Sequence, residues 1–257
     1  MQHPATAVLN ALTYFPERRI VATPEQFGVG YEDLWLRTGD GETINAWFVR
    51  AVGEPVGHLL YAHGNGGNIG DRSGVLAVLA AAGFDVLTFD YRGFGRSSGK
   101  PSERGTYLDA RAARAALLEQ PGVKADRVVY LGKSLGGGVL LELADAFPPA
   151  ALVLMSTFTG LRNAAKAVYP FLPKVFVPNA YPSLARIRRL RCPVLIMHGD
   201  ADELLPVSMG RALYEAAPEP KQLVIYPGAA HDNLVAIPEW PGTLAAWVRR
   251  TLARDPV

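Results

Sequence analysis

Short apolar runs alternate along most of this chain with longer stretches in which apolar residues recur every three or four positions. The short runs are typical of buried strands, and the longer periodic stretches are typical of amphipathic helices. The predicted strands cover residues 31–38, 43–51, 58–63, 84–91, 126–131, 151–156, 193–198 and 222–226, and the predicted helices cover 72–82, 103–120, 135–147, 207–216 and 238–253. Because strands that alternate with helices form βαβ units, the pattern predicts an α/β fold with about eight strands in a mostly parallel sheet flanked by helices.

One stretch, residues 158–192, interrupts this alternation. It holds four prolines and several aromatic residues between two predicted strands. Connections of this length usually carry a function of their own, such as a lid over an active site. We therefore expect a single domain over residues 1–257, with a short cap or lid inserted at about residues 158–192.

The composition fits a globular chain with a sizeable core, since 49% of its 257 residues are hydrophobic. The formal net charge of +2 gives no reason to expect a nucleic-acid partner. Cys192 is the single cysteine, so it cannot form an internal disulfide. Its place before an apolar strand favours a buried thiol, and the absence of a cysteine pair fits a cytoplasmic protein.

The first 15 residues lack the features of a targeting or membrane segment. No basic region precedes their apolar residues, and no hydrophobic stretch approaches 18 residues. The sequence therefore predicts neither a signal peptide nor an integral membrane segment. Residues 5–15 fit a short amphipathic helix that we expect to pack on the body of the protein, with peripheral membrane contact as the open alternative.

A glycine-flanked serine carries the clearest chemical signal in the chain. The pentapeptide Gly132-Lys133-Ser134-Leu135-Gly136 lies between an apolar, strand-like run and a helix-like run. This context is that of a nucleophile elbow, in which a serine lies on a tight turn from strand to helix. Ser134 is therefore the predicted nucleophile, and the motif implies acyl transfer.

A serine nucleophile needs a histidine base within hydrogen-bond reach. Two histidines follow Ser134 in the chain, His198 and His231. His231 lies on a loop of small residues after the last predicted strand. In proteins with a nucleophile elbow, the base lies at this position. We expect His231 to be the base and His198, at the end of the preceding strand, to support the loop.

The base in turn needs a carboxylate that orients it. The acid is expected on the loop after strand 193–198, where the candidates are Asp200, Asp202 and Glu203. Asp202 is far enough into the loop to turn toward the base, whereas Asp200 lies at the turn and is better placed to cap backbone N–H groups.

The negative charge that develops on the substrate oxygen needs hydrogen-bond donors, an oxyanion hole. One expected donor is the backbone N–H of Leu135, directly after the nucleophile. The other is expected from the glycine-rich loop at 63–68, where Asn65 is our choice. This loop has neither a Walker Gly-Lys-Ser/Thr sequence nor GxGxxG, so it does not predict a nucleotide site.

These features resemble the α/β-hydrolase superfamily. More narrowly, they are similar to the single-domain "alpha/beta-hydrolase domain-containing" serine hydrolases, whose eukaryotic relatives include protein depalmitoylases. The matching stretches are Tyr14-Phe15-Pro16-Glu17-Arg18-Arg19, His63-Gly64-Asn65-Gly66-Gly67-Asn68-Ile69-Gly70, Phe89-Asp90-Tyr91-Arg92-Gly93-Phe94-Gly95-Arg96-Ser97, Gly132-Lys133-Ser134-Leu135-Gly136-Gly137 and Cys192-Pro193-Val194-Leu195-Ile196-Met197-His198-Gly199-Asp200-Ala201-Asp202.

The resemblance implies an α/β-hydrolase fold and the hydrolysis of a small-molecule ester or thioester, with no metal or organic cofactor. In the family's His-Gly-x-x-Asp pattern the last aspartate is the triad acid, which here is Asp202. Two departures are expected: the first residues predict no N-terminal anchor like that of many relatives, and Asp232 follows the base where the family pattern suggests asparagine or glycine.

The aromatic and apolar residues of the expected cap have two open interpretations. They line an acyl pocket, or they form a core that holds the cap down. The residues concerned are Tyr169, Phe171, Leu172, Phe176, Val177 and Tyr181.

Two other functions stay open beside the esterase or thioesterase. The same residues would serve an aminopeptidase or amidase, although the cap shows no obvious acidic pair for a substrate amino group. A non-catalytic binding protein on the same fold is the second alternative. A dehalogenase is disfavoured because the elbow carries serine rather than aspartate.

Several charged residues have a simpler structural interpretation. We expect Asp90 and Arg92 to bond the loops around the elbow, and Lys133 to face solvent. The basic run Arg186, Arg188, Arg189 and Arg191 is expected to form a solvated helix face.

Overall fold

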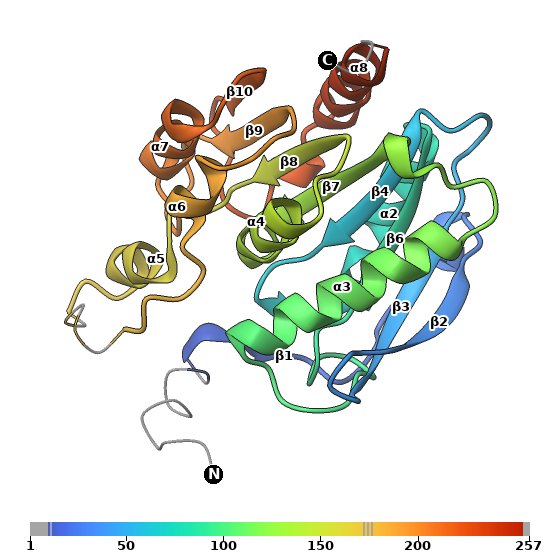
Figure 1. The fold of residues 1–257 in the computed structure, drawn as a ribbon, viewed down its shortest axis with the longest axis horizontal. Coiled ribbons are helices and arrows are strands. Elements are labelled where there is room, and N and C mark those ends of the chain that lie inside the picture. The colour runs from blue at the N-terminus through green and yellow to red at the C-terminus, as the bar shows by residue number, and fades with distance from the viewer. Residues whose placement is uncertain (1–9, 11, 172, 174, 176, 254–257) are drawn as a thin grey trace.

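A mostly parallel sheet forms the centre of the computed structural model, which describes residue 10, residues 12–171, 173, 175 and 177–253 (Figure 1). In these residues the sheet has eight strands in the order β10-β9-β8-β7-β4-β6-β3-β2. The strands are β2 (Glu32–Arg37), β3 (Thr43–Val49), β4 (Gly57–Ala62), β6 (Phe84–Phe89), β7 (Val128–Lys133), β8 (Ala151–Met155), β9 (Val194–Gly199) and β10 (Lys221–Tyr226). Within this described sheet the β2–β3 and β3–β6 pairs are antiparallel, and the other neighbouring strands are parallel. The predicted α/β architecture is therefore confirmed.

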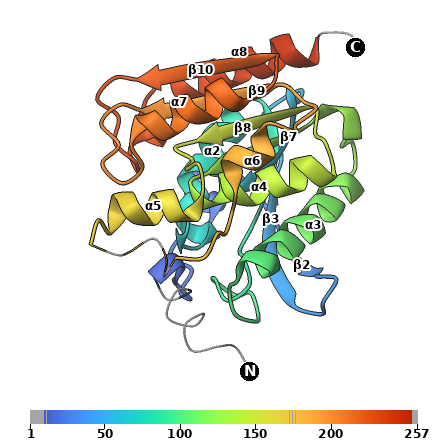
Figure 2. The same cartoon turned by 60° about the vertical axis from the view of Figure 1, so that its left-hand side comes forward.

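Helices cover both faces of the sheet (Figure 2). The helices α3 (Glu103–Glu119), α4 (Leu135–Ala146), α6 (Ser183–Ile187) and α7 (Val207–Ala216) pack on one face, and α2 (Ser73–Ala81) and α8 (Trp240–Leu252) pack on the other. Strands buried on both faces need apolar side chains at successive positions, which is why their sequences read as continuous apolar runs.

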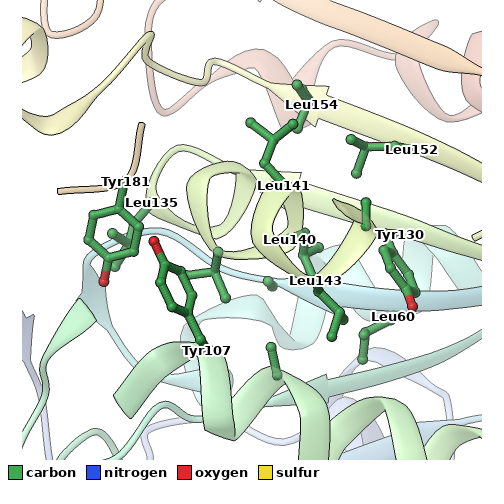
Figure 3. Packing of buried hydrophobic residues seen from close by; sticks show 14 of the residues in the cluster. Leu60, Tyr107, Tyr130, Leu135, Leu140, Leu141, Leu143, Leu152, Leu154 and Tyr181 are labelled. Atoms are coloured by element: carbon green, nitrogen blue, oxygen red, sulfur yellow. The ribbon is translucent and has the colours of Figure 1, made fainter. Parts of the chain in front are cut away.

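Strand β4 illustrates how these runs serve two cores. Leu60 and Ala62 point into the core beneath α3 and α4, whereas Leu59 and Tyr61 point into the core beneath α2 and α8. Figure 3 shows the first of these cores, where leucines of α4 lie between the sheet and α3. Helix α4 is thus held tightly at the point where the chain leaves β7.

The N-terminal segment adds an element that the sequence analysis did not predict. Residues Phe15–Pro16 form a short strand, β1, parallel to β5 at Gly66–Gly67 in the glycine-rich loop. Most of the expected N-terminal helix, residues 5–9 and 11, lies outside the described residues. Within the described residues, no helix has the length and apolar character needed to cross a membrane.

In its described residues, the stretch between β8 and β9 contains the helices α5 (Leu161–Val168) and α6 rather than one long loop. The amphipathic helix α5 lies to one side, and the short α6 packs on the core beside α4. The Tyr181 side chain between them is fully buried. The single domain and the cap remain predictions.

Candidate active site

Ser134 lies between β7 and α4 in a backbone conformation that few non-glycine residues adopt. Its φ of 53° and ψ of −115° place it outside the favoured regions. The turn closes because Gly132 and Gly136, two residues to either side, lack side chains: a Cβ on Gly136 would lie 2.0 Å from the carbonyl oxygen of Ala62. The Ser134 N–H donates to the Met155 carbonyl at 2.9 Å, which anchors the turn to β8. Such strain is characteristic of functional sites.

Asp202 and His231 are hydrogen-bonded to each other. The His231 Nδ1 lies 2.8 Å from Asp202 Oδ2, and the carboxylate is fully buried while the imidazole is 12% exposed. The other oxygen, Oδ1, accepts the N–H groups of Leu204 at 3.1 Å and Leu205 at 2.8 Å. With a carboxylate as the acceptor at Nδ1, a neutral His231 carries its proton there, and Nε2 keeps the lone pair.

The environment of Asp202 favours its ionised form. Burial alone would raise the pKa of Asp202, but hydrogen bonds from His198, His231 and the Leu205 N–H outweigh burial and hold this pKa well below its usual range. The carboxylate is therefore charged at neutral pH. This charge can stabilise a protonated His231.

The two other residues near this acid support the loops, as expected. The buried His198 places Nε2 2.8 Å from the Leu205 carbonyl oxygen and 3.4 Å from Asp202 Oδ2. Asp200 accepts the Gly228 N–H at 2.7 Å and so ties the loop of His231 to the end of β9.

One candidate oxyanion donor, Leu135, directly follows Ser134, and the other, Asn65, lies in the glycine-rich loop. Leu135 is the first residue of α4, so its N–H has no acceptor within the helix. The side-chain Nδ2 of Asn65 donates to the Thr13 carbonyl at 2.9 Å, and the backbone carbonyl of Asn65 accepts the Phe15 N–H at 2.8 Å. Its side-chain amide is therefore engaged, which leaves the backbone N–H as the group that could serve an oxyanion.

A cavity of about 360 Å³ opens at these residues. Ser134, His231, Asn65 and Leu135 all line it, whereas Asp202 lies behind His231. The rest of the lining is mostly apolar: Leu12, Thr13, Phe15, Phe158, Leu161, Ala164, Ala165, Val168, Tyr169, Val177, Leu204 and Leu205. No Asp, Glu, Lys or Arg occurs among the described lining residues, so the cavity suits an uncharged, apolar group.

Comparison with known proteins connects this chain to hydrolases. Residues 57–181 match the family described as "alpha/beta hydrolase fold", and residues 182–235 match the one described as "Serine aminopeptidase, S33". "Uncharacterized protein Rv2307c" of Mycobacterium tuberculosis is 38% identical over 224 residues, which cover 86% of this chain and 80% of that protein. Human "Alpha/beta hydrolase domain-containing protein 17B" is 31% identical over 222 residues, which cover 86% and 76%. The chain belongs to the alpha/beta hydrolase superfamily.

The fold of this alpha/beta hydrolase is also found in a solved esterase structure. Esterase Pf2001 of Pyrococcus furiosus superposes with a TM-score of 0.78 at 21% identity, covering 94% of this chain and 98% of the esterase. At this identity the similarity establishes the shared fold alone.

The residues predicted to line the pocket lie in different places in the structure. Tyr169 lines the cavity, but Phe171 does not; it is 83% exposed, with its ring edge-on to Tyr169. Leu172 and Phe176 lie outside the described residues. Tyr181 belongs to the core instead, where its hydroxyl lies 2.6 Å from that of Tyr14.

Much of the cavity wall of this hydrolase was not foreseen. Leu12, Thr13 and Phe15 arrive from the N-terminal segment, and nothing local marks them as pocket residues. Helix α5 contributes Leu161, Ala164, Ala165 and Val168, which recur at the spacing of one helix face. That periodicity could have identified the helix and its apolar face.

The prediction that Lys133 faces solvent is wrong. Its side chain is only 8% exposed, and its Nζ donates to Asp232 Oδ1 at 3.0 Å. The sequence-based expectation failed because the partner comes from a loop 99 residues away.

The remaining charged residues are structural, as expected for Asp90 and Arg92. Asp90 accepts the Ile69 N–H at 2.9 Å, and Arg92 binds both Asp40 and Asp109. These contacts hold the loops around the elbow in place.

The basic run is not uniformly solvated. Arg188 and Arg191 are exposed, but Arg186 donates to the Tyr107 hydroxyl at 2.6 Å and lies over its ring. Arg189 pairs with Asp145.

Cys192 is buried, and burial raises the pKa of its thiol to about 12. The thiol is therefore unreactive at neutral pH. Among the described residues, no three His, Cys, Asp or Glu side chains are grouped so as to hold a metal ion.

Proposed function

We propose that this alpha/beta hydrolase is a serine esterase or thioesterase that acts on small-molecule substrates. Ser134 Oγ attacks the carbonyl carbon while His231 Nε2 takes its proton, and the N–H groups of Leu135 and Asn65 bind the resulting oxyanion. His231 then gives the proton to the departing alcohol or thiol. Water, activated by His231, attacks the acyl-enzyme and releases the acid, which restores Ser134. Asp202 keeps His231 in the required tautomer throughout.

The hydrogen bond between Asp202 and His231 carries this proposal, because it joins a buried, ionised carboxylate to an imidazole in the same cavity as Ser134. The strained turn at Ser134 is a second support, since the strain of an elbow exposes its nucleophile. The apolar lining supports an aliphatic or aromatic acyl group as the part of the substrate that the cavity receives.

The first test is labelling by a fluorophosphonate probe together with turnover of p-nitrophenyl esters. We expect the wild-type protein to label and to hydrolyse the ester, and Ser134→Ala to lose both. Ser156→Ala is a matched control, because Ser156 is also buried with a positive φ of 45° but lies outside the cavity lining. Labelling that survives in Ser134→Ala would refute the proposal.

An aminopeptidase or amidase is the second candidate, favoured by the match of residues 182–235 to "Serine aminopeptidase, S33". The described cavity lining includes no carboxylate that could bind a free amino group. We therefore expect esters to be turned over much faster than the matching amino-acyl amides. The reverse order would favour the peptidase, and a folded protein that neither labels nor turns over any substrate would favour a binding protein.

A further inference from the structure

An ion pair connects the two loops that carry the proposed nucleophile and the proposed base. Lys133 directly precedes Ser134, and Asp232 directly follows His231. The Lys133 Nζ donates to Asp232 Oδ1 at 3.0 Å. The lysine side chain is 8% exposed and the aspartate side chain 82%, so the pair is fixed at the buried end and open to solvent at the other.

Other hydrogen bonds tie each loop to its own part of the sheet. The loop 227–233 is joined to the end of β9, for example by the Gly228 N–H, which donates to Asp200 at 2.7 Å. The elbow, residues 132–137, is joined to β8 through the Ser134 N–H. In the described part of the chain, the lysine–aspartate pair is the only hydrogen bond or ion pair between these two loops.

The pairing with Lys133 favours the ionised form of Asp232. Partial burial alone would raise the pKa of Asp232, but the hydrogen bond from Lys133 lowers this pKa below its ordinary value. A buried ammonium group needs such a partner, because an unpaired charge away from water is costly. The partner that Lys133 has is the residue next to the base.

We propose that this ion pair is a clasp between the two loops, and that Lys133 and Asp232 are positioning residues for Ser134 and His231. The inference rests on the proposed function. Asp202 orients the imidazole ring, but its other contacts are with Leu204, Leu205 and His198, none of which lies on the elbow. The clasp holds the ring against the elbow, because it lies one residue from each reacting group.

The expected effect of the clasp is on rate rather than on substrate binding. Proton transfer requires Ser134 Oγ and His231 Nε2 within hydrogen-bond reach. A displacement of about 1 Å at such a site can cost about 10² in rate. Neither Lys133 nor Asp232 lines the cavity, so the affinity for substrate is expected to change little.

The test measures kcat, KM, the fluorophosphonate labelling rate and the melting temperature of Asp232→Ala, Lys133→Met and the double variant. Glu32→Ala is the matched control. Glu32 lies on the edge strand β2, and its substitution breaks an exposed ion pair with Arg50. Asp232 is largely exposed, so Asp232→Ala is expected to fold and carries the test even if Lys133→Met does not.

We expect Asp232→Ala and Lys133→Met each to lower kcat and the labelling rate by about tenfold, with KM changed less than about twofold. The double variant should be no slower than either single variant, since each alone opens the clasp. The clasp would be overturned if Asp232→Ala kept wild-type rates. It would also be overturned if the loss of rate in the double variant equalled the product of the two single losses. Either result would leave the proposed function intact. A folded wild-type protein that neither labels nor hydrolyses esters would remove the proposed function, and the clasp with it.

Discussion

At the scale of single residues, the partners of the Asp202 carboxylate define its role. One oxygen accepts two backbone N–H groups, and the other faces His231 and His198. These contacts hold the carboxylate in one orientation. A residue held in this way can fix the tautomer of an imidazole.

Replacing this carboxylate by an amide provides a sharp test of the proposed acid. We expect Asp202→Asn to lower kcat by about 10⁴, because the amide favours the wrong tautomer of His231. Steady-state kinetics with a p-nitrophenyl ester measures the effect. Glu203→Gln is the control, since Glu203 is an exposed neighbour that the sequence left as a candidate acid. A larger loss in Glu203→Gln than in Asp202→Asn would reassign the acid.

At the scale of elements, the turn from β7 to α4 depends on close backbone contact. A Cβ on Gly136 would collide with the Ala62 carbonyl oxygen of β4, and a rigid backbone atom cannot give way cheaply. Glycine at this position therefore lets helix α4 lie close to β4. The turn thus has a packing role that does not depend on the proposed chemistry of Ser134.

Gly136→Ala is expected to lower the free energy of unfolding by about 1–3 kcal/mol through overpacking. Urea denaturation measures the change. Gly242→Ala in α8 is the control, because a Cβ there meets no atom within 4 Å. It should raise the free energy of unfolding by about 0.5–1 kcal/mol, the usual advantage of alanine inside a helix. Equal effects of the two substitutions would contradict the close contact at the elbow.

The apolar face of α5 is expected to set how long an acyl chain the cavity accepts. Ala165→Phe would fill part of the cavity, so kcat/KM for long-chain esters should fall by about tenfold or more while short-chain esters are little affected. A series of p-nitrophenyl esters of increasing acyl length measures this preference. Lys166→Ala, exposed on the same helix and absent from the lining, should keep the wild-type profile. A uniform loss over all acyl lengths would argue against α5 as the acyl wall.

At the scale of the whole molecule, the proposed catalytic groups come from three strands that end at the same edge of the sheet. Ser134 follows β7, Asp202 follows β9 and His231 follows β10. Parallel strands place their carboxyl ends together, so residues far apart in the chain meet there. The proposed site is therefore built from the same packed sheet edge as the fold, so a change of charge at the site also changes the stability of the fold.

This link predicts a pH dependence of folding stability. Because the pKa of Asp202 is lowered in the folded state, its ionised form contributes stability above the unfolded pKa of about 3.9. That contribution is lost as the pH falls below this value toward the folded pKa. The wild-type protein should therefore exceed Asp202→Asn in stability most above about pH 5, and the gap should shrink toward pH 3. Urea denaturation of both proteins over this pH range measures the gap, and a constant gap would contradict the expectation.

The sequence by itself determined most strands and helices in their chain order, the turn at Ser134, and the small set of residues from which an acid and a base could come. These features depend on local periodicity and motif spacing, which can be read along the chain. The sequence analysis did not predict helix α5, although the apolar residues on one face of this helix recur at helical spacing. The choice of Asp202 over its neighbours came from resemblance to a family.

Only the tertiary structure decided which residues meet across the chain. The cavity wall takes Phe15 from the N-terminal segment, and Lys133 is buried against Asp232 rather than exposed. Such contacts depend on how distant segments pack, and neither partner carries a local signal of the other. The residues of the proposed chemistry can therefore be identified along the sequence. The shape of the cavity and the proposed clasp beside it depend on the packing of the loops at one edge of the sheet.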